Sequence, residues 1–227
     1  MTQVTYYGHS CFLVETKGAK LLFDPFITPN ILAKEIKFDG ISCDFIFVSH
    51  GHEDHCADLI EIATRTKATV LGSWELHTWL NSKNISNTHP MNIGGKRQFD
   101  FGEVKMVYAA HSNSLPDGSY GGTAAGFIIK NNKTCFYYSG DTALTTDMKL
   151  IGEIYKPDFA FLPIGSNFTM DAADAAIATG FINCKNIIGM HYDTFGYIKI
   201  EHDKAIMEFE KANATLTLMK IGESINI

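Results

Sequence analysis

The residues whose chemistry is clearest lie in one short segment, Ser49-His50-Gly51-His52-Glu53-Asp54-His55, which has the pattern H-x-H-x-D-H. Imidazole nitrogens and carboxylate oxygens are ligands for divalent metal ions. The segment follows the apolar run 44–48, which predicts a strand buried on both faces, and Gly51 lets the backbone turn tightly beyond it. Four ligand-type side chains within six residues suit two metal ions better than one. A solvated polar loop is the weaker interpretation.

Three further residues of ligand type come directly after predicted strands: His111 after 103–110, Asp141 after 134–139 and His191 after 187–190. Strand ends are where sheets deliver side chains to a site. Each residue alone has an ordinary explanation, because a strand-end histidine is often a hydrogen-bonded structural residue and an aspartate after Ser-Gly often forms a turn. Their shared placement, together with the first motif, favours a metal site.

The elements that must position these side chains alternate between strands and helices. Residues 25–43 have no clear period and predict a loop, and Gly121-Gly122, which lacks a phosphate-loop context, predicts a flexible one. The pattern predicts an α/β or α+β fold in which helices cover sheets. The predicted strands are 3–7, 11–16, 21–23, 44–48, 68–71, 103–110, 123–130, 134–139, 158–163, 187–190 and 215–220, and the predicted helices are 56–66, 74–81, 146–155, 171–182 and 201–212.

Composition narrows the class of protein. The chain has 227 residues with no Pro- or Ser-rich linker, so we expect a single domain over 1–227. With 45% hydrophobic and 19% charged residues it is an ordinary globular sequence. A formal charge of -6 argues against nucleic-acid binding, because phosphate affinity needs clustered cations. The sequence also predicts no membrane span, since apolar runs fall short of ~18 residues.

The cysteines and the first residues of the chain indicate in which cellular compartment the protein is expected. The five cysteines are odd in number and widely spaced, with no C-x-x-C pair, which fits a reducing compartment. The first residues lack the pattern of a signal peptide. We therefore expect a cytoplasmic protein.

The order H-x-H-x-D-H, then His111, then Asp141 in a Gly-Asp turn, then His191 resembles that of the metallo-β-lactamase superfamily. Three other segments resemble the uncharacterised metal-dependent hydrolase group near the ascorbate-phosphate lactonases and the phospholipase D-like members: Gly8-His9-Ser10-Cys11-Phe12-Leu13, Leu22-Phe23-Asp24-Pro25 and Gly165-Ser166-Asn167-Phe168-Thr169-Met170. The resemblance implies a four-layer αββα sandwich of two mixed sheets flanked by helices. It also implies that one metal is held by His50, His52 and His111 and a second by Asp54, His55 and His191, with Asp141 bridging them.

The implied activity is that of a metal-dependent hydrolase with two divalent ions, zinc being the first expectation and Mn²⁺, Fe²⁺ or Ni²⁺ the alternatives. A hydroxide bridging the two ions would attack an ester, lactone, amide or phosphodiester bond in a small molecule. Asp54 could also accept a proton as the nucleophile attacks. The bridging position is Asp141 and not a cysteine, which departs from the antibiotic-hydrolysing branch.

Three residues are weaker site candidates. The resemblance suggests that His9 lies close to the metals and bonds to substrate or to a ligand carboxylate, with a structural hairpin histidine as the alternative. Asn167 and Tyr192 could bind substrate as oxyanion donors, although polar loop residues often have no such role.

Two rival functions stay open at this level. One is a mono-iron or di-iron oxidoreductase on the same scaffold, which metal analysis would reveal. The other is a non-catalytic module that binds metal or senses a ligand, although closed structural sites are four-coordinate and do not need seven candidate ligands. The sequence does not decide the oligomeric state, so a homo-oligomer is as open as a monomer.

Overall fold

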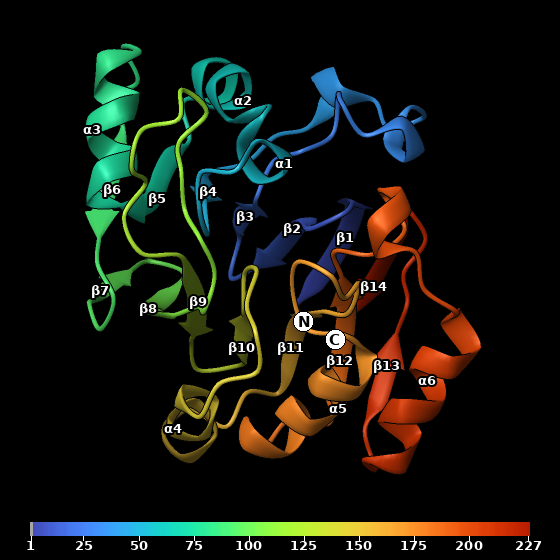
Figure 1. Ribbon diagram of the computed structural model, residues 1–227. Helices are drawn as coiled ribbons and strands as arrows, with labels where there is room; N and C mark the ends of the chain where they lie inside the picture. Colours follow the sequence, from blue (N-terminus) through green and yellow to red (C-terminus); the bar gives the residue numbers. More distant parts are fainter. Residues whose placement is uncertain (1) are drawn as a thin grey trace. The chain divides into compact units, whose positions relative to one another are not determined.

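The computed structural model describes residues 2–227, which divide into two compact units with one seven-stranded sheet each (Figure 1). The first unit comprises the chain up to Gly95, Ser112–Ala124 and Lys220–Ile227. The second comprises Lys96–His111 and Ala125–Met219. None of the helices in the described part of the chain has the length and apolar character that crossing a bilayer requires.

The sheet of the first unit has the strand order β14-β1-β2-β3-β4-β5-β6. β1, β2 and β3 form an antiparallel meander, and β3 to β6 run parallel. Apolar side chains of α2 and α3 pack against those of β4 and β5. The elements are β1 Gln3–Gly8, β2 Cys11–Thr16, β3 Ala19–Phe23, η1 Ile31–Ala33, η2 Phe38–Gly40, β4 Phe45–Phe47, α1 Glu53–Cys56, α2 Leu59–Thr66, β5 Thr69–Ser73, α3 Trp74–Ser82, β6 Thr88–Met91 and β14 Ser224–Asn226.

The sheet of the second unit has the order β13-β12-β11-β10-β9-β8-β7. β7 to β10 pair antiparallel and β10 to β13 parallel. A core that includes small residues of α5 and Phe209 of α6 covers this sheet. The elements are β7 Lys96–Phe99, β8 Gly102–Tyr108, β9 Ala125–Lys130, β10 Cys135–Tyr138, α4 Asp147–Ile154, β11 Phe159–Pro163, α5 Ala172–Phe181, β12 Asn186–Met190, η3 Gly196–Ile198, α6 His202–Lys211 and β13 Thr215–Thr217.

Two mixed sheets flanked by helices confirm the predicted fold class. The strands that the sequence did not predict are β6, β7 and β14, and each lies at an edge of its sheet. Edge strands are short, polar and tolerant of proline, so they lack the alternating apolar signal. β6 contains Pro90, and most of β7 is exposed.

The predicted helix 56–66 was wrong in its bounds, because the structure has two helices there. α1 begins at Glu53, inside the histidine motif, so Asp54 and His55 lie on a helical turn and not in a loop. Asp58 separates α1 from α2, and its carboxylate accepts hydrogen bonds from the backbone nitrogens of Ile27 and Thr28. At this break between the two helices, the Asp58 side chain therefore holds the loop that follows β3.

We predict that the five cysteines are unreactive in the folded protein. All five are free and buried. Burial raises the pKa of the thiols of Cys43, Cys135 and Cys184 to about 11, that of Cys56 to about 12, and that of Cys11 well above its ordinary value. Since the thiolate is the nucleophile, an aromatic disulfide reagent at pH 8 should modify no thiol in native protein and five in guanidinium. Rapid modification of any thiol in the native protein would contradict this prediction.

Candidate metal centre

In the first unit, β4 delivers the histidine motif to one edge of the sheet. β4 lies between β3 and β5, both parallel to it, and His50 and His52 follow within five residues of its end. His50 Nε2 and His52 Nδ1 are 3.0 Å apart. Two nitrogens that bind one zinc ion at about 2.0–2.1 Å lie about 3–3.5 Å from each other. This pair therefore fits the coordination shell of a single ion.

Asp24, which directly follows β3, connects His55 and, through Ser49, His50 by buried hydrogen bonds. Its Oδ2 accepts hydrogen bonds from His55 Nδ1 at 2.8 Å and from Ser49 Oγ at 2.6 Å, and its Oδ1 accepts one from Ser49 N at 2.7 Å. Ser49 Oγ also lies 2.9 Å from His50 Nδ1. Because the serine proton goes to Asp24, His50 Nδ1 must be the donor in that contact. In both histidines this makes Nε2 the candidate metal-ligand atom.

Sequence reasoning missed the role of Asp24, because the segment Leu22-Phe23-Asp24-Pro25 served only as part of the family resemblance and Asp24 was not among the candidate site residues. Asp24, His50 and His55 each offer a ligand-type atom within 4.8 Å of the others. The signal that could have identified Asp24 was the one used for Asp141, an acidic residue immediately after a predicted buried strand.

His9 lies in the turn between β1 and β2, and its Nε2 is 3.1 Å from Asp54 Oδ2. The His9 side chain is buried, whereas that of Asp54 is 26% exposed. His9 has a positive φ of 56°, a conformation that non-glycine residues rarely adopt, and Tyr6 Oη donates to its carbonyl at 3.1 Å. Backbone strain of this kind persists where the surrounding structure enforces it. The strained turn directs the imidazole toward the Asp54 carboxylate.

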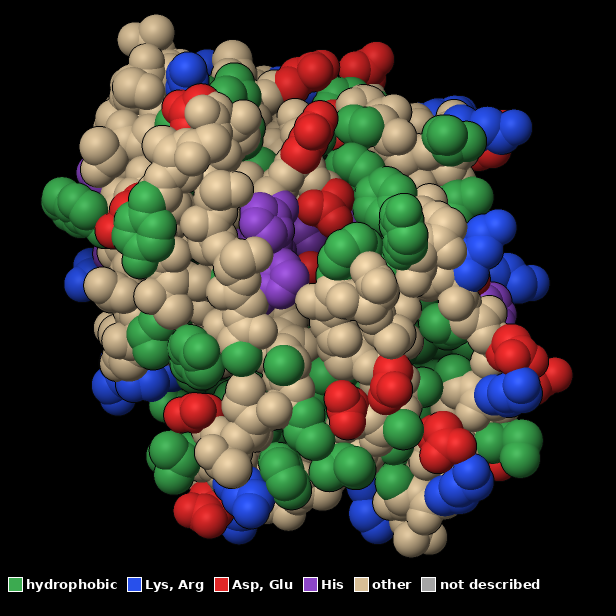
Figure 2. Space-filling view, viewed as in Figure 1, with side chains coloured by type: hydrophobic (Ala, Val, Ile, Leu, Met, Phe, Trp, Pro, Cys, Tyr) green, Lys and Arg blue, Asp and Glu red, His purple; other side chains and the backbone are tan. Residues whose placement is uncertain are grey.

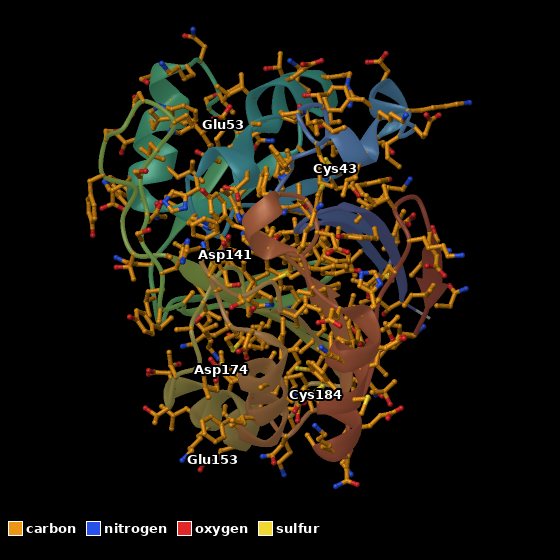
Figure 3. The ribbon with its side chains drawn as sticks, turned by 45° about the vertical axis from the view of Figure 1, so that its right-hand side comes forward. Cys43, Glu53, Asp141, Glu153, Asp174 and Cys184 are labelled. Carbon is orange, nitrogen blue, oxygen red and sulfur yellow. The ribbon has the colours of Figure 1, made fainter. Side chains whose placement is uncertain are left out.

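In the second unit, Asp141 lies beside two histidines from other strand ends. Its Oδ2 is 2.9 Å from His191 Nε2 and 3.7 Å from His111 Nε2. β8, β10 and β12 run in the same direction, so the residues that follow them gather at one edge of the sheet. Figure 3 shows Asp141 apart from Glu153 and Asp174, which lie on the helices α4 and α5. The structure thus brings the three strand-end residues of this unit together.

The two residues predicted to bind substrate differ in their surroundings. Asn167 is exposed and has a positive φ of 58° in the turn between β11 and α5. Tyr192 is only 6% exposed, belongs to the apolar core of the second unit and packs edge-on against His202 at 5.7 Å between ring centroids. Asn167 is therefore accessible to a ligand, whereas the side chain of Tyr192 is almost fully enclosed by the protein.

The site can be reached from solvent. His52 is partly exposed, as is Asp54, and Figure 2 shows histidine side chains at the surface beside acidic ones. On the same face, Lys and Arg side chains lie toward the rim of the view and not beside the histidines. Imidazoles backed by buried hydrogen-bond partners and open on one side are what a metal-binding hydrolytic site requires.

Comparison with known proteins places the chain in a family. The profile of the Beta-lactamase superfamily domain matches residues 3–191. A protein from Methylacidiphilum infernorum named UPF0173 metal-dependent hydrolase is 48% identical over 98% of this chain and 99% of its own, and one of the same name from Flavobacterium johnsoniae is 47% identical over 99% and 100%. The chain belongs to the beta-lactamase superfamily, as its motifs predicted.

A solved structure supports the same assignment. Igni18, described as a novel metallo hydrolase from the archaeon Ignicoccus hospitalis, matches with a TM-score of 0.90 and 34% identity over 99% of this chain and 97% of its own. The predicted class of enzyme, a metal-dependent hydrolase, is confirmed by these relatives.

We predict that Asp24→Asn weakens metal binding about 10–100-fold, the usual effect of losing a partner behind a ligand histidine. Asparagine cannot accept from His55 and from both Ser49 donors at once. Competition with a chromophoric chelator would measure the affinity. Asp44→Asn is the matched control, because exposed Asp44 accepts from Lys20 N at the opposite end of β4. Equal affinities in the two variants would refute the role given to Asp24.

Proposed function

We propose that the chain hydrolyses an ester, lactone or phosphodiester bond in a small molecule with the help of two divalent metal ions. In this proposal His50, His52 and His111 hold one ion, Asp54, His55 and His191 hold the other, and Asp141 bridges them. The supporting observation is the spacing of donor atoms within each unit: 3.0 Å between His50 Nε2 and His52 Nδ1, and 2.9 Å between Asp141 Oδ2 and His191 Nε2.

The donor set fits such ions in its chemistry. Neutral imidazoles with a hydrogen bond on the second nitrogen are good ligands for zinc and for Mn²⁺, Fe²⁺ or Ni²⁺, and a shared carboxylate is typical of binuclear sites. Two such ions lower the pKa of a bound water and polarise the oxygen of the bond to be cleaved. Zinc is the first candidate because imidazole nitrogens dominate the set.

The residues of this chain then have distinct tasks. Asp24 and Ser49 orient His55 and His50 through the hydrogen bonds given above. In this proposal Asp54 accepts a proton, and His9, whose Nε2 is 3.1 Å from Asp54 Oδ2, holds that carboxylate in place. Exposed Asn167 is the residue we assign to substrate contact. Tyr192, which follows His191 in sequence, is the second residue that we assign to substrate binding, as an oxyanion donor.

We predict that protein purified without added metal contains two divalent ions per chain. A chelator should remove them together with hydrolytic turnover, and restoring the same metal should return it, because the ions supply the activated water. Elemental analysis and panels of ester, lactone and phosphodiester substrates provide the measurements. Iron with a redox-active spectrum and oxygen consumption would favour an oxidoreductase instead. Bound metal with no turnover of any panel would favour a sensing module.

We predict that Asp54→Asn lowers kcat by about 10²–10⁴-fold, the range expected when a general acid–base group is lost. The adjacent Glu53→Gln is the matched control, because Glu53 lies on the same helix and is exposed. It should retain wild-type kcat and metal content. Steady-state kinetics and elemental analysis of both variants separate loss of proton transfer from loss of metal. A similar loss in both variants would contradict a specific role for Asp54.

A further inference from the structure

Asn113 joins the turn between two metal-ligand candidates to a loop of the same unit. Its Oδ1 accepts a hydrogen bond from Gly51 N at 2.8 Å, and its Nδ2 donates one to Gly121 O at 2.7 Å. Gly51 lies between His50 and His52. The asparagine amide therefore bridges two backbone groups from segments 62 and 8 residues away in sequence.

The peptide groups of Gly51 are held from both sides. Its nitrogen donates to Asn113, and its carbonyl accepts from Cys56 Sγ at 3.2 Å. A Cβ at position 51 would lie 2.7 Å from Ser114 O and 2.9 Å from a methyl carbon of Leu115. Close backbone approach, as well as the tight turn, thus requires glycine here. The segment 113–115 therefore packs directly against the turn at Gly51 and holds it in place.

The loop on the other side of Asn113 is anchored, contrary to the flexible loop predicted for Gly121-Gly122. Gly121 N donates to Asn113 O at 3.3 Å, and Ser73 Oγ, at the start of α3, donates to Gly121 O at 2.7 Å. Trp79 Nε1 on α3 donates to Asp117 Oδ2 at 2.9 Å. A side chain at 121 would overlap Asn113, so glycine there permits packing and not mobility. Asn113 is consequently supported by a helix through the loop.

We propose that Asn113 is a positioning residue for the metal ligands His50 and His52. Its amide fixes the orientation of the peptide between them and with it the spacing of their ligand nitrogens. His111 is the third ligand assigned to the ion that His50 and His52 hold. Because Asn113 follows His111 by two residues, the hydrogen bond from Gly51 N to Asn113 Oδ1 also restrains the chain just after His111. The inference rests on the proposed function for the existence of that ion, and it gives a role to Asn113, which lies outside the metal-ligand motifs.

The experiment compares three variants of the full chain. Asn113→Leu has similar volume and loses both hydrogen bonds, whereas Asn113→Asp keeps the acceptor for Gly51 N. Asn87→Leu is the matched control, because Asn87 also bridges backbone and side chain, donating to Lys67 O at 2.8 Å and accepting from Thr69 Oγ1, at the opposite edge of the same sheet. Zinc affinity by chelator competition and the visible spectrum of the cobalt-substituted protein are the readouts.

Asn113→Leu should bind one of the two ions about 10–100-fold more weakly and shift the cobalt bands, as loss of support behind a ligand does. Asn113→Asp keeps the acceptor for Gly51 N but places a carboxylate oxygen against Gly121 O, so its affinity and spectrum should fall between those of Asn113→Leu and the wild type. Asn87→Leu should stay near wild type in both. Wild-type affinity and spectrum in Asn113→Leu would overturn the proposal, and so would an equal loss in Asn113→Asp or Asn87→Leu. If circular dichroism shows that Asn113→Leu is unfolded, Asn113→Ser, too short to reach both partners, takes its place with the same expected result. A wild-type protein without metal affinity would overturn the proposed function itself.

Discussion

A buried carboxylate is tolerated only when hydrogen-bond donors surround it, and the site depends on one such group, Asp24. Its two oxygens take three hydrogen bonds from His55 and Ser49, and Ser49 in turn faces His50. This arrangement ties the end of β3 to the chain leaving β4, its parallel neighbour. The same contacts that make the buried charge acceptable also decide which ring nitrogen of His50 and of His55 faces away from Ser49 and Asp24, so folding and side-chain orientation have one cause.

Three residues discussed for the candidate site adopt unfavourable backbone geometry. Asp24, His9 and His191 all have positive φ, at 41°, 56° and 56°. Gly165 approaches the backbone of His191 so closely that a Cβ would lie 2.0 Å from His191 O. Strain of this kind costs on the order of 1–3 kcal/mol per residue and persists where tertiary packing enforces it. Here it coincides with the residues assigned to metal or to a ligand carboxylate, which is where aiming a side chain matters most.

Most of the fold was predictable because buried strands and amphipathic helices have clear periods. The predicted 3–7, 11–16 and 158–163 agree with β1, β2 and β11 within a residue. The missed strands β6, β7 and β14 lie at sheet edges, where exposure removes the apolar pattern. The motif histidines could be proposed as ligands because several ligand types are close in sequence. His111, Asp141 and His191 could be proposed because strands of one direction end at one edge of a sheet.

By itself, the sequence determined which side chains can bind metal and that they stand at strand ends, since both follow from residue type and local periodicity. Only the tertiary structure decided how those side chains are held. Asp24 meets His55 across 31 residues, His9 meets Asp54 across 45, and Asn113 meets Gly51 across 62. Contacts at such separations leave no period in a sequence, because they depend on which strands become neighbours and how closely the backbone of one loop approaches another.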